Sequence, residues 1–82
     1  MTQTEVKRIL RYLRKVHRRL YDFSIGEASW QAELARLDEV ITDIMVASAE
    51  SEEGAGRVML YYLETKARHC RECILKLERR QN

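Results

Sequence analysis

The sequence predicts an all-α fold: a small antiparallel three-helix bundle in up-down-up order, with coiled-coil-like packing and a long C-terminal helix. Two observations lead to this prediction. Apolar residues recur at alternating steps of three and four along three stretches of the chain, which is the period of a helix with one buried side. The 82 residues include no proline and only three glycines, a composition that favours long helices over a turn-rich β fold.

The first helix is expected at about residues 3–23. Thr2 and Glu5 have the spacing of a capping box, which satisfies backbone N–H groups at a helix start. The apolar stripe of this helix is Val6, Ile9, Leu13, Val16, Leu20 and Phe23. At about 100° per residue, seven cations fall on the opposite side. They are named the basic face here and comprise Lys7, Arg8, Arg11, Arg14, Lys15, Arg18 and Arg19.

A break at Ser24, Gly26 and Ser29 precedes the second helix, which is expected at about residues 28–47. Its apolar stripe is Trp30, Leu34, Leu37, Ile41 and Ile44. The third helix is expected at about residues 53–80, with the stripe Met59, Leu63, Ala67, Cys70, Ile74 and Leu77. Its start is inferred from charge, because Glu50, Glu52 and Glu53 oppose the dipole at a helix C-terminus but suit a first turn. Ser48 or Ser51 would then cap it.

The third helix is expected to be longer than its neighbours, at about 40 Å against about 30 Å. Its last two turns should therefore protrude and expose Ile74, Leu75 and Leu77 to a second subunit. A single domain of 82 residues buries only about 60–65% of its unfolded surface, so self-association is expected. A helical hairpin that completes its core by dimerising is the alternative architecture.

Several classes of protein are disfavoured by composition. No apolar run reaches the about 20 residues that a membrane span needs, and the N-terminus lacks a signal-peptide segment. Two cysteines three residues apart fit a reducing compartment, so a cytoplasmic location without membrane association is expected. The sequence has no phosphate-cradling glycine loop and no convincing set of nucleophile and base, so we expect no enzyme and no cofactor.

Charge is segregated along the chain. Residues 5–22 carry seven cations against two acids, residues 27–53 carry Arg36 against eight acids, and residues 57–80 carry seven cations against three acids. Two basic segments flanking an acidic one can neutralise each other across a bundle. The default interpretation of the basic face is therefore pairing with the acidic segment, or simple solvation.

Binding of an anionic partner is the other interpretation of the basic face, and the partner is either a protein or a nucleic acid. Arginine outnumbers lysine five to two there, which favours forked contacts with carboxylates or phosphates. Tyr12, at the margin, is placed to stack on a base. The candidate contact residues are Arg8, Arg11, Tyr12, Arg14, Lys15, Arg18 and Arg19. No helix-turn-helix, zinc-finger or RNA-binding signature accompanies them.

His69, Cys70 and Cys73 form the one cluster with metal-ligand chemistry, and His17 in the first helix would complete a set of four. A CxxC zinc site normally lies in a tight turn, whereas this one falls inside a predicted helix with Cys70 on its apolar stripe. We therefore expect no metal there, because a free cysteine on such a stripe behaves as a small hydrophobe.

Together these observations predict a non-catalytic interaction module, or a small regulator or inhibitor, that binds another protein through charged helix faces. Tyr61, with Val46 on the back of the second helix, is a candidate partner contact, and Tyr61, Ile74, Leu75 and Leu77 are the candidate oligomer or partner interface. The alternative is a nucleic-acid-binding protein that uses the basic face.

Overall fold

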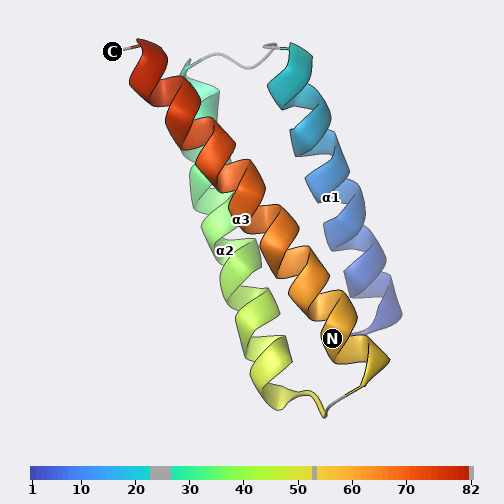
Figure 1. Ribbon diagram of the computed structural model, residues 1–82. Helices are drawn as coiled ribbons and strands as arrows, with labels where there is room; N and C mark the ends of the chain where they lie inside the picture. Colours follow the sequence, from blue (N-terminus) through green and yellow to red (C-terminus); the bar gives the residue numbers. More distant parts are fainter. Residues whose placement is uncertain (23–26, 53, 82) are drawn as a thin grey trace.

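The computed structural model describes residues 1–22, 27–52 and 54–81, and it is a bundle of helices (Figure 1). The helices are α1 (Gln3–Asp22), α2 (Glu27–Glu50) and α3 (Ala55–Gln81). The described residues contain no β-strand, so the predicted all-α class is confirmed. The molecule measures 43 × 18 × 16 Å, and the 27 residues of α3, at about 1.5 Å each, extend along nearly its whole length.

The start of α1 is fixed by Thr2, as the capping-box spacing predicts. The Thr2 Oγ1 atom accepts a hydrogen bond from the Glu5 backbone N–H and donates one to the Glu5 carboxylate, each at 3.2 Å. The Thr2 carbonyl accepts from the Val6 N–H at 3.0 Å. The Thr2 hydroxyl thereby satisfies the Glu5 N–H, one of the groups left over at a helix N-terminus, and the Thr2 carbonyl accepts the first intrahelical bond. Phe23, the predicted last residue of this helix, lies outside the described residues.

The junction between α2 and α3 differs from the prediction. Helix α2 continues to Glu50, three residues beyond the expected end at Ala47, and α3 begins at Ala55. Ser51 does not cap α3, because its Oγ and backbone N–H both donate to the Ser48 carbonyl and close the end of α2. The Gly54 carbonyl instead accepts hydrogen bonds from the backbone N–H groups of Arg57 and Val58, and Gly54 has φ = +149°, a conformation that favours glycine.

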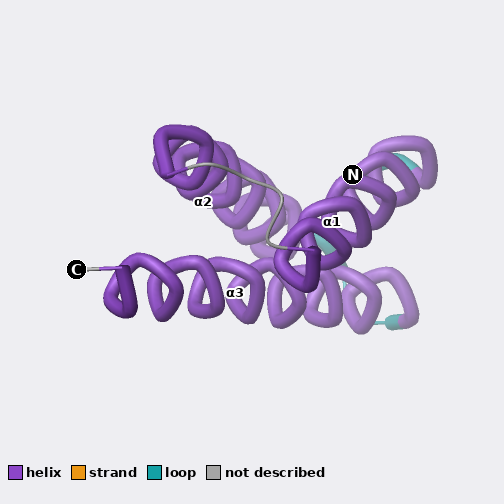
Figure 2. Tube along the Cα trace, turned by 90° about the horizontal axis from the view of Figure 1, so that it is seen from above, coloured by secondary structure: helices purple, strands orange, loops and turns teal. Residues whose placement is uncertain are grey.

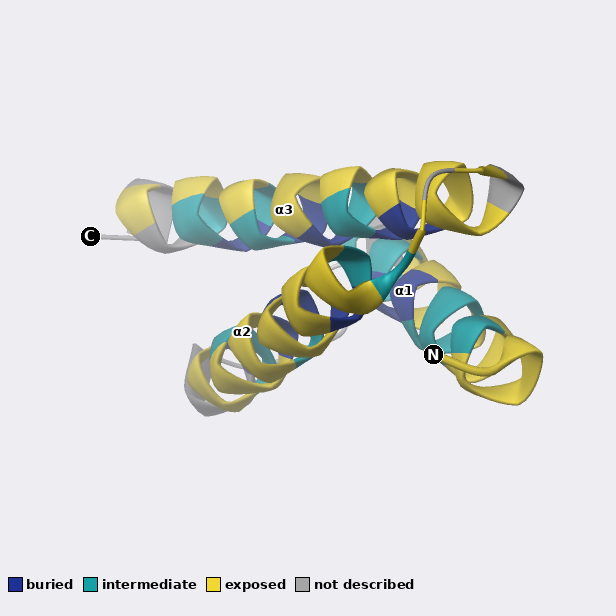
Figure 3. Cartoon of the chain, turned by 90° about the horizontal axis from the view of Figure 1, so that it is seen from below, coloured by how far each residue is buried: buried dark blue, intermediate teal, exposed yellow. Residues whose placement is uncertain are grey.

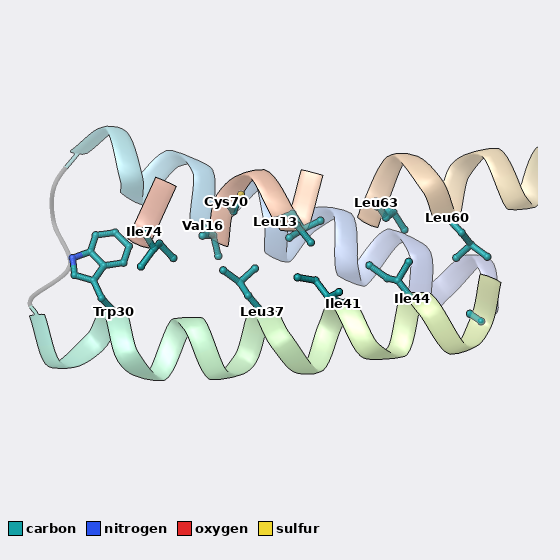
Figure 4. Close-up of a cluster of buried hydrophobic side chains, with 12 residues drawn as sticks. Leu13, Val16, Trp30, Leu37, Ile41, Ile44, Leu60, Leu63, Cys70 and Ile74 are labelled. Carbon is teal, nitrogen blue, oxygen red and sulfur yellow. The ribbon is translucent and has the colours of Figure 1, made fainter. Parts of the chain in front are cut away.

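The core is an apolar cluster contributed by all three helices (Figure 4). Its buried members are Leu13, Val16, Trp30, Leu37, Ile41, Ile44, Ala47, Leu60, Leu63, Ala67, Cys70 and Ile74. Val6, Ile9, Leu20, Leu34 and Leu77 from the predicted stripes are partly buried and pack against it. Within the described residues, no polar or charged side chain is buried. The helical period therefore identified the buried sides of α1 and α2 correctly.

The α3 stripe requires two corrections. Leu60 is buried where Met59 was expected, and Met59 is 42% exposed. Ile74, expected on a protruding end, is fully buried in the same cluster as Trp30, and Figure 4 shows both at one end of that cluster. The reason is that Trp30, near the start of α2, lies at the same end of the cluster, so α2 still covers α3 at Ile74. Leu75 and Leu77 are half-buried.

Helix α3 packs against both of the other helices, whereas α1 and α2 contact each other less. Figure 2 shows α1 and α2 on the same side of α3 and inclined to each other. The buried positions, dark blue in Figure 3, lie where the helices meet, and the outer sides of the helices are mostly exposed. This arrangement leaves the basic face of α1 directed away from α3.

Candidate functional site

The basic face of α1 is largely unpaired. Six of its seven cations are exposed, namely Lys7, Arg8, Arg11, Arg14, Lys15 and Arg18. Among the described residues, only Arg19 pairs with α2: its Nη1 lies 3.8 Å from the Glu33 Oε2 atom. For the other six, the described part of the chain provides no carboxylate within 4 Å. Neutralisation by α2 therefore extends to Arg19 and not to the rest of the face.

One carboxylate of α2, that of Asp38, pairs with a cation on α3. Arg71 Nε donates to the Asp38 Oδ1 atom at 2.7 Å, and both side chains are about half exposed. Arg68 contacts the Met45 sulfur at 3.5 Å and lies 3.8 Å from Glu64 on its own helix. Exposed pairs of this kind contribute little stability, at about 0–1 kcal/mol each. Among the described residues, charge matching across the bundle is therefore limited to one α1–α2 pair, Arg19 with Glu33, and one α2–α3 pair, Arg71 with Asp38.

Tyr12 belongs to a network of side chains between α1 and α2. Its hydroxyl donates to the Glu33 Oε1 atom, and the Arg36 guanidinium carbon lies 4.8 Å from the centre of its ring. Burial, together with the hydrogen bond to Glu33, raises the pKa of the Tyr12 hydroxyl well above its usual value. Tyr12 is thus a half-buried member of this network, and its ring is not a free surface for stacking a base.

Next to this network the two helices enclose a small cleft with a volume of about 260 Å³. It is lined by Arg11, Tyr12, Lys15, Val16, Arg19, Glu33 and Arg36, and this set is called the cationic cleft below. Sequence reasoning identified its α1 cations but missed Glu33 and Arg36. The sequence does set Arg36 apart, because it is the only cation among residues 27–53, and this could have marked it as a candidate.

Exposed apolar side chains gather around the junction of α2 and α3. Tyr61 is 70% exposed and Val46 is 52% exposed, as predicted for contact residues. The remaining exposed apolar residues near this junction, missed by the sequence reasoning, are Met45, Val58, Met59 and Tyr62. Val58, Tyr61 and Tyr62 are spaced three and four apart and so share the outer side of α3. Of the predicted interface on α3, Tyr61 is accessible, whereas Ile74 is in the core.

The three residues of the histidine–cysteine cluster do not share one environment: Cys70 is buried, Cys73 is half-buried and His69 is exposed. Cys73 Sγ lies 3.7 Å from the His69 Nε2 atom, and the rings of His17 and His69 are 6.5 Å apart. Cys70 points into the core, and burial raises the pKa of its thiol. The described residues contain no group of three His, Cys, Asp or Glu side chains placed to hold a metal ion. His69 and Cys73 are therefore neighbours, while Cys70 serves packing.

None of the described helices is long and apolar enough to cross a membrane. Comparison of the chain with known protein families, with curated proteins and with solved structures finds no match.

Proposed function

We propose that this chain is a non-catalytic interaction module whose basic face binds an acidic surface of another protein. The observation that carries this proposal is the set of exposed α1 cations without a carboxylate partner in the described part of the chain. Like charges held together on one helix repel each other, and an acidic partner would remove that repulsion.

The geometry of α1 suits an extended partner. Arg8, Arg11, Lys15 and Arg18 follow each other at steps of three, four and three, so they form one line along the helix. Successive members of this line lie about one turn, or about 5.4 Å, apart. Arginine also forms forked hydrogen bonds with carboxylates, which favours a specific acidic partner over a diffuse ion atmosphere.

We also propose an antiparallel, up-down-up order of the helices with coiled-coil-like packing. The contacts between helices support the order: Asp38 and Met45 ascend along α2, while their partners Arg71 and Arg68 descend along α3. The steps of three and four in the buried stripes support the packing. Both cysteines are free, which supports a cytoplasmic location.

Self-association is the proposed role of the exposed apolar side chains near the junction of α2 and α3. Tyrosine and methionine are enriched in the cores of protein interfaces, and Val58, Tyr61 and Tyr62 present adjacent apolar surface on one helix. This surface replaces the C-terminal end of α3 as the proposed subunit contact, because Ile74 is buried within the chain.

Nucleic-acid binding is the second candidate function. It is favoured by the arginine content of the basic face and by the regular spacing of its exposed cations, both of which suit a phosphate backbone. The involvement of Tyr12 in the network with Glu33 disfavours recognition of unstacked bases. Binding through this face would then be to backbone phosphates and would weaken steeply with salt.

The test compares wild-type protein with two matched variants as immobilised bait in a cell extract. Arg14→Gln/Arg18→Gln removes two exposed cations from the basic face, and Lys76→Gln/Arg79→Gln removes two exposed cations from α3 as a control. We expect at least one acidic protein to be retained by the wild type and the control but lost from the basic-face variant. If all three baits retain the same proteins, the proposed function is wrong.

Fluorescence anisotropy with labelled duplex DNA and single-stranded RNA, at low and physiological salt, separates the two candidates. Binding that falls steeply with salt and is weakened only in the basic-face variant would favour the nucleic-acid function. Circular dichroism of each variant checks that the helices are intact, which is expected because all four positions are exposed.

A further inference from the structure

Four cations converge on the cationic cleft between α1 and α2. Three of them, Arg11, Lys15 and Arg19, come from α1, and Arg36 comes from α2. Arg36 is the only cation among residues 27–53, where eight acids are available as partners. It nevertheless lies beside the cations of α1. Its contact with the Tyr12 ring, at 4.8 Å, holds it there against the repulsion between like charges.

The one carboxylate in the cleft is already engaged on both oxygens. Glu33 Oε1 accepts from the Tyr12 hydroxyl, and Glu33 Oε2 lies 3.8 Å from Arg19. The Glu33 side chain is only 12% exposed, so it forms part of the floor of the cleft rather than its rim. Its charge is offset by Arg19. Among the described residues, Arg11, Lys15 and Arg36 have no ion pair.

Two of the cations are held in place by neighbouring side chains. Arg36 lies over the Tyr12 ring at 4.8 Å, and Arg19 is oriented by Glu33. Tyr12 is itself fixed by its hydrogen bond to Glu33. Side chains that are oriented before a ligand arrives lose less conformational entropy when it binds. The cleft therefore differs from the rest of the basic face, whose cations have no such support.

We propose that the cationic cleft binds a small, multiply charged phosphate anion such as pyrophosphate. The volume of about 260 Å³ limits the ligand to a compact molecule. The excess of cations over carboxylates suits an anion of more than one charge, and arginine forks match the oxygen geometry of a phosphoryl group. The proposal goes beyond the proposed function, since Glu33 and Arg36 belong to α2 and the ligand needs no protein partner.

Isothermal titration of the full chain with pyrophosphate, at constant ionic strength, tests this site. Arg36→Gln removes the α2 cation from the cleft, and Arg14→Gln removes an equally charged, exposed residue outside it. We expect saturable binding by the wild type that Arg36→Gln weakens by about tenfold or more, as loss of a charge-assisted hydrogen bond would. Arg14→Gln should change the affinity by less than about twofold, since long-range charge is screened at physiological salt.

Two outcomes would overturn the proposal. One is the absence of saturable binding by the wild type. The other is an equal loss of affinity in Arg36→Gln and Arg14→Gln, which would mean that pyrophosphate responds to net charge and not to the cleft. Circular dichroism of both variants confirms that the comparison is made on folded protein. Capture of a protein partner from the cell extract is a separate measurement. If pyrophosphate does not bind in the cleft, that measurement still tests the proposed function.

Discussion

Replacing Ile74 by alanine is expected to destabilise the bundle by about 3 kcal/mol. Ile74 is fully buried in the apolar cluster, and the substitution removes three side-chain carbon atoms. At about 0.8 kcal/mol for each carbon taken from water, the lost transfer free energy is about 2.4 kcal/mol, and the cavity left behind adds to it. A domain of 82 residues has a total stability of about 4–12 kcal/mol, so this loss is a large fraction of it.

Urea unfolding, followed by circular dichroism and by fluorescence of the single tryptophan, measures this loss. Trp30 belongs to the same cluster as Ile74, so its emission reports on this end of the core. Thermal unfolding should show a midpoint lower by about 12–24 °C for a loss of 3 kcal/mol in a domain of this size. All samples are compared at one protein concentration, because self-association would otherwise shift the apparent stability.

Leu75→Ala is the matched control, since Leu75 is adjacent in sequence but only half-buried. Its expected cost is about 1 kcal/mol or less. Light scattering after size-exclusion chromatography gives the mass of each variant. A loss below about 1 kcal/mol for Ile74→Ala, accompanied by a change in subunit number, would refute the burial argument and restore Ile74 as a subunit contact.

Three further predictions follow from local features. Because the pKa of Tyr12 is raised in the folded chain, the unfolded chain loses the phenolic proton first, so the free energy of unfolding should fall as pH rises above about 10. Tyr12→Phe should flatten that fall. The same dependence of stability on pH in the wild type and in Tyr12→Phe would contradict the burial of this hydroxyl. Gly54→Ala should lower the free energy of unfolding in urea by about 1–3 kcal/mol, because φ is +149°; no atom crowds the new methyl group, so the cost comes from the backbone alone. Gly56→Ala within α3 should be neutral or stabilising. In a Cys73→Ser background the buried Cys70 thiol should react with a disulfide reagent only after unfolding, and rapid labelling of native protein would show that this core position opens.

The sequence predicted best those features that depend on neighbouring residues. The Thr2 cap involves groups within one turn, and the buried sides of α1 and α2 follow from the period of their apolar residues. The choice between Met59 and Leu60 did not follow, because either residue fits a helical stripe that continues at Leu63. Packing against α2 decides between them, and that contact is absent from a one-dimensional pattern.

The end of α2 was predicted wrongly because an electrostatic signal was given too much weight. An unfavourable charge at a helix C-terminus costs only about 0.3–1 kcal/mol when exposed. Burial of Ala47 and the closure of the helix by Ser51 are enough to carry α2 on to Glu50. The added residues do not account for the burial of Ile74, because they lie at the C-terminal end of α2, whereas Ile74 shares its end of the core with Trp30 near the start of α2.

The basic face is left largely unpaired because α1 packs mainly against α3 and only slightly against α2. The apolar stripe of α1 rests mainly on α3, which is itself basic, and its contacts with the acidic α2 are fewer. Most acids of α2 lie out of reach of the α1 cations from this position, and among the described residues Arg19 and Glu33 are the one ion pair between these helices. The acidic segment therefore does not neutralise the described cations of α1 other than Arg19, although the charges along the sequence would allow it. The charge that remains is concentrated on α1, and at the cationic cleft Arg36 adds to it instead of cancelling it.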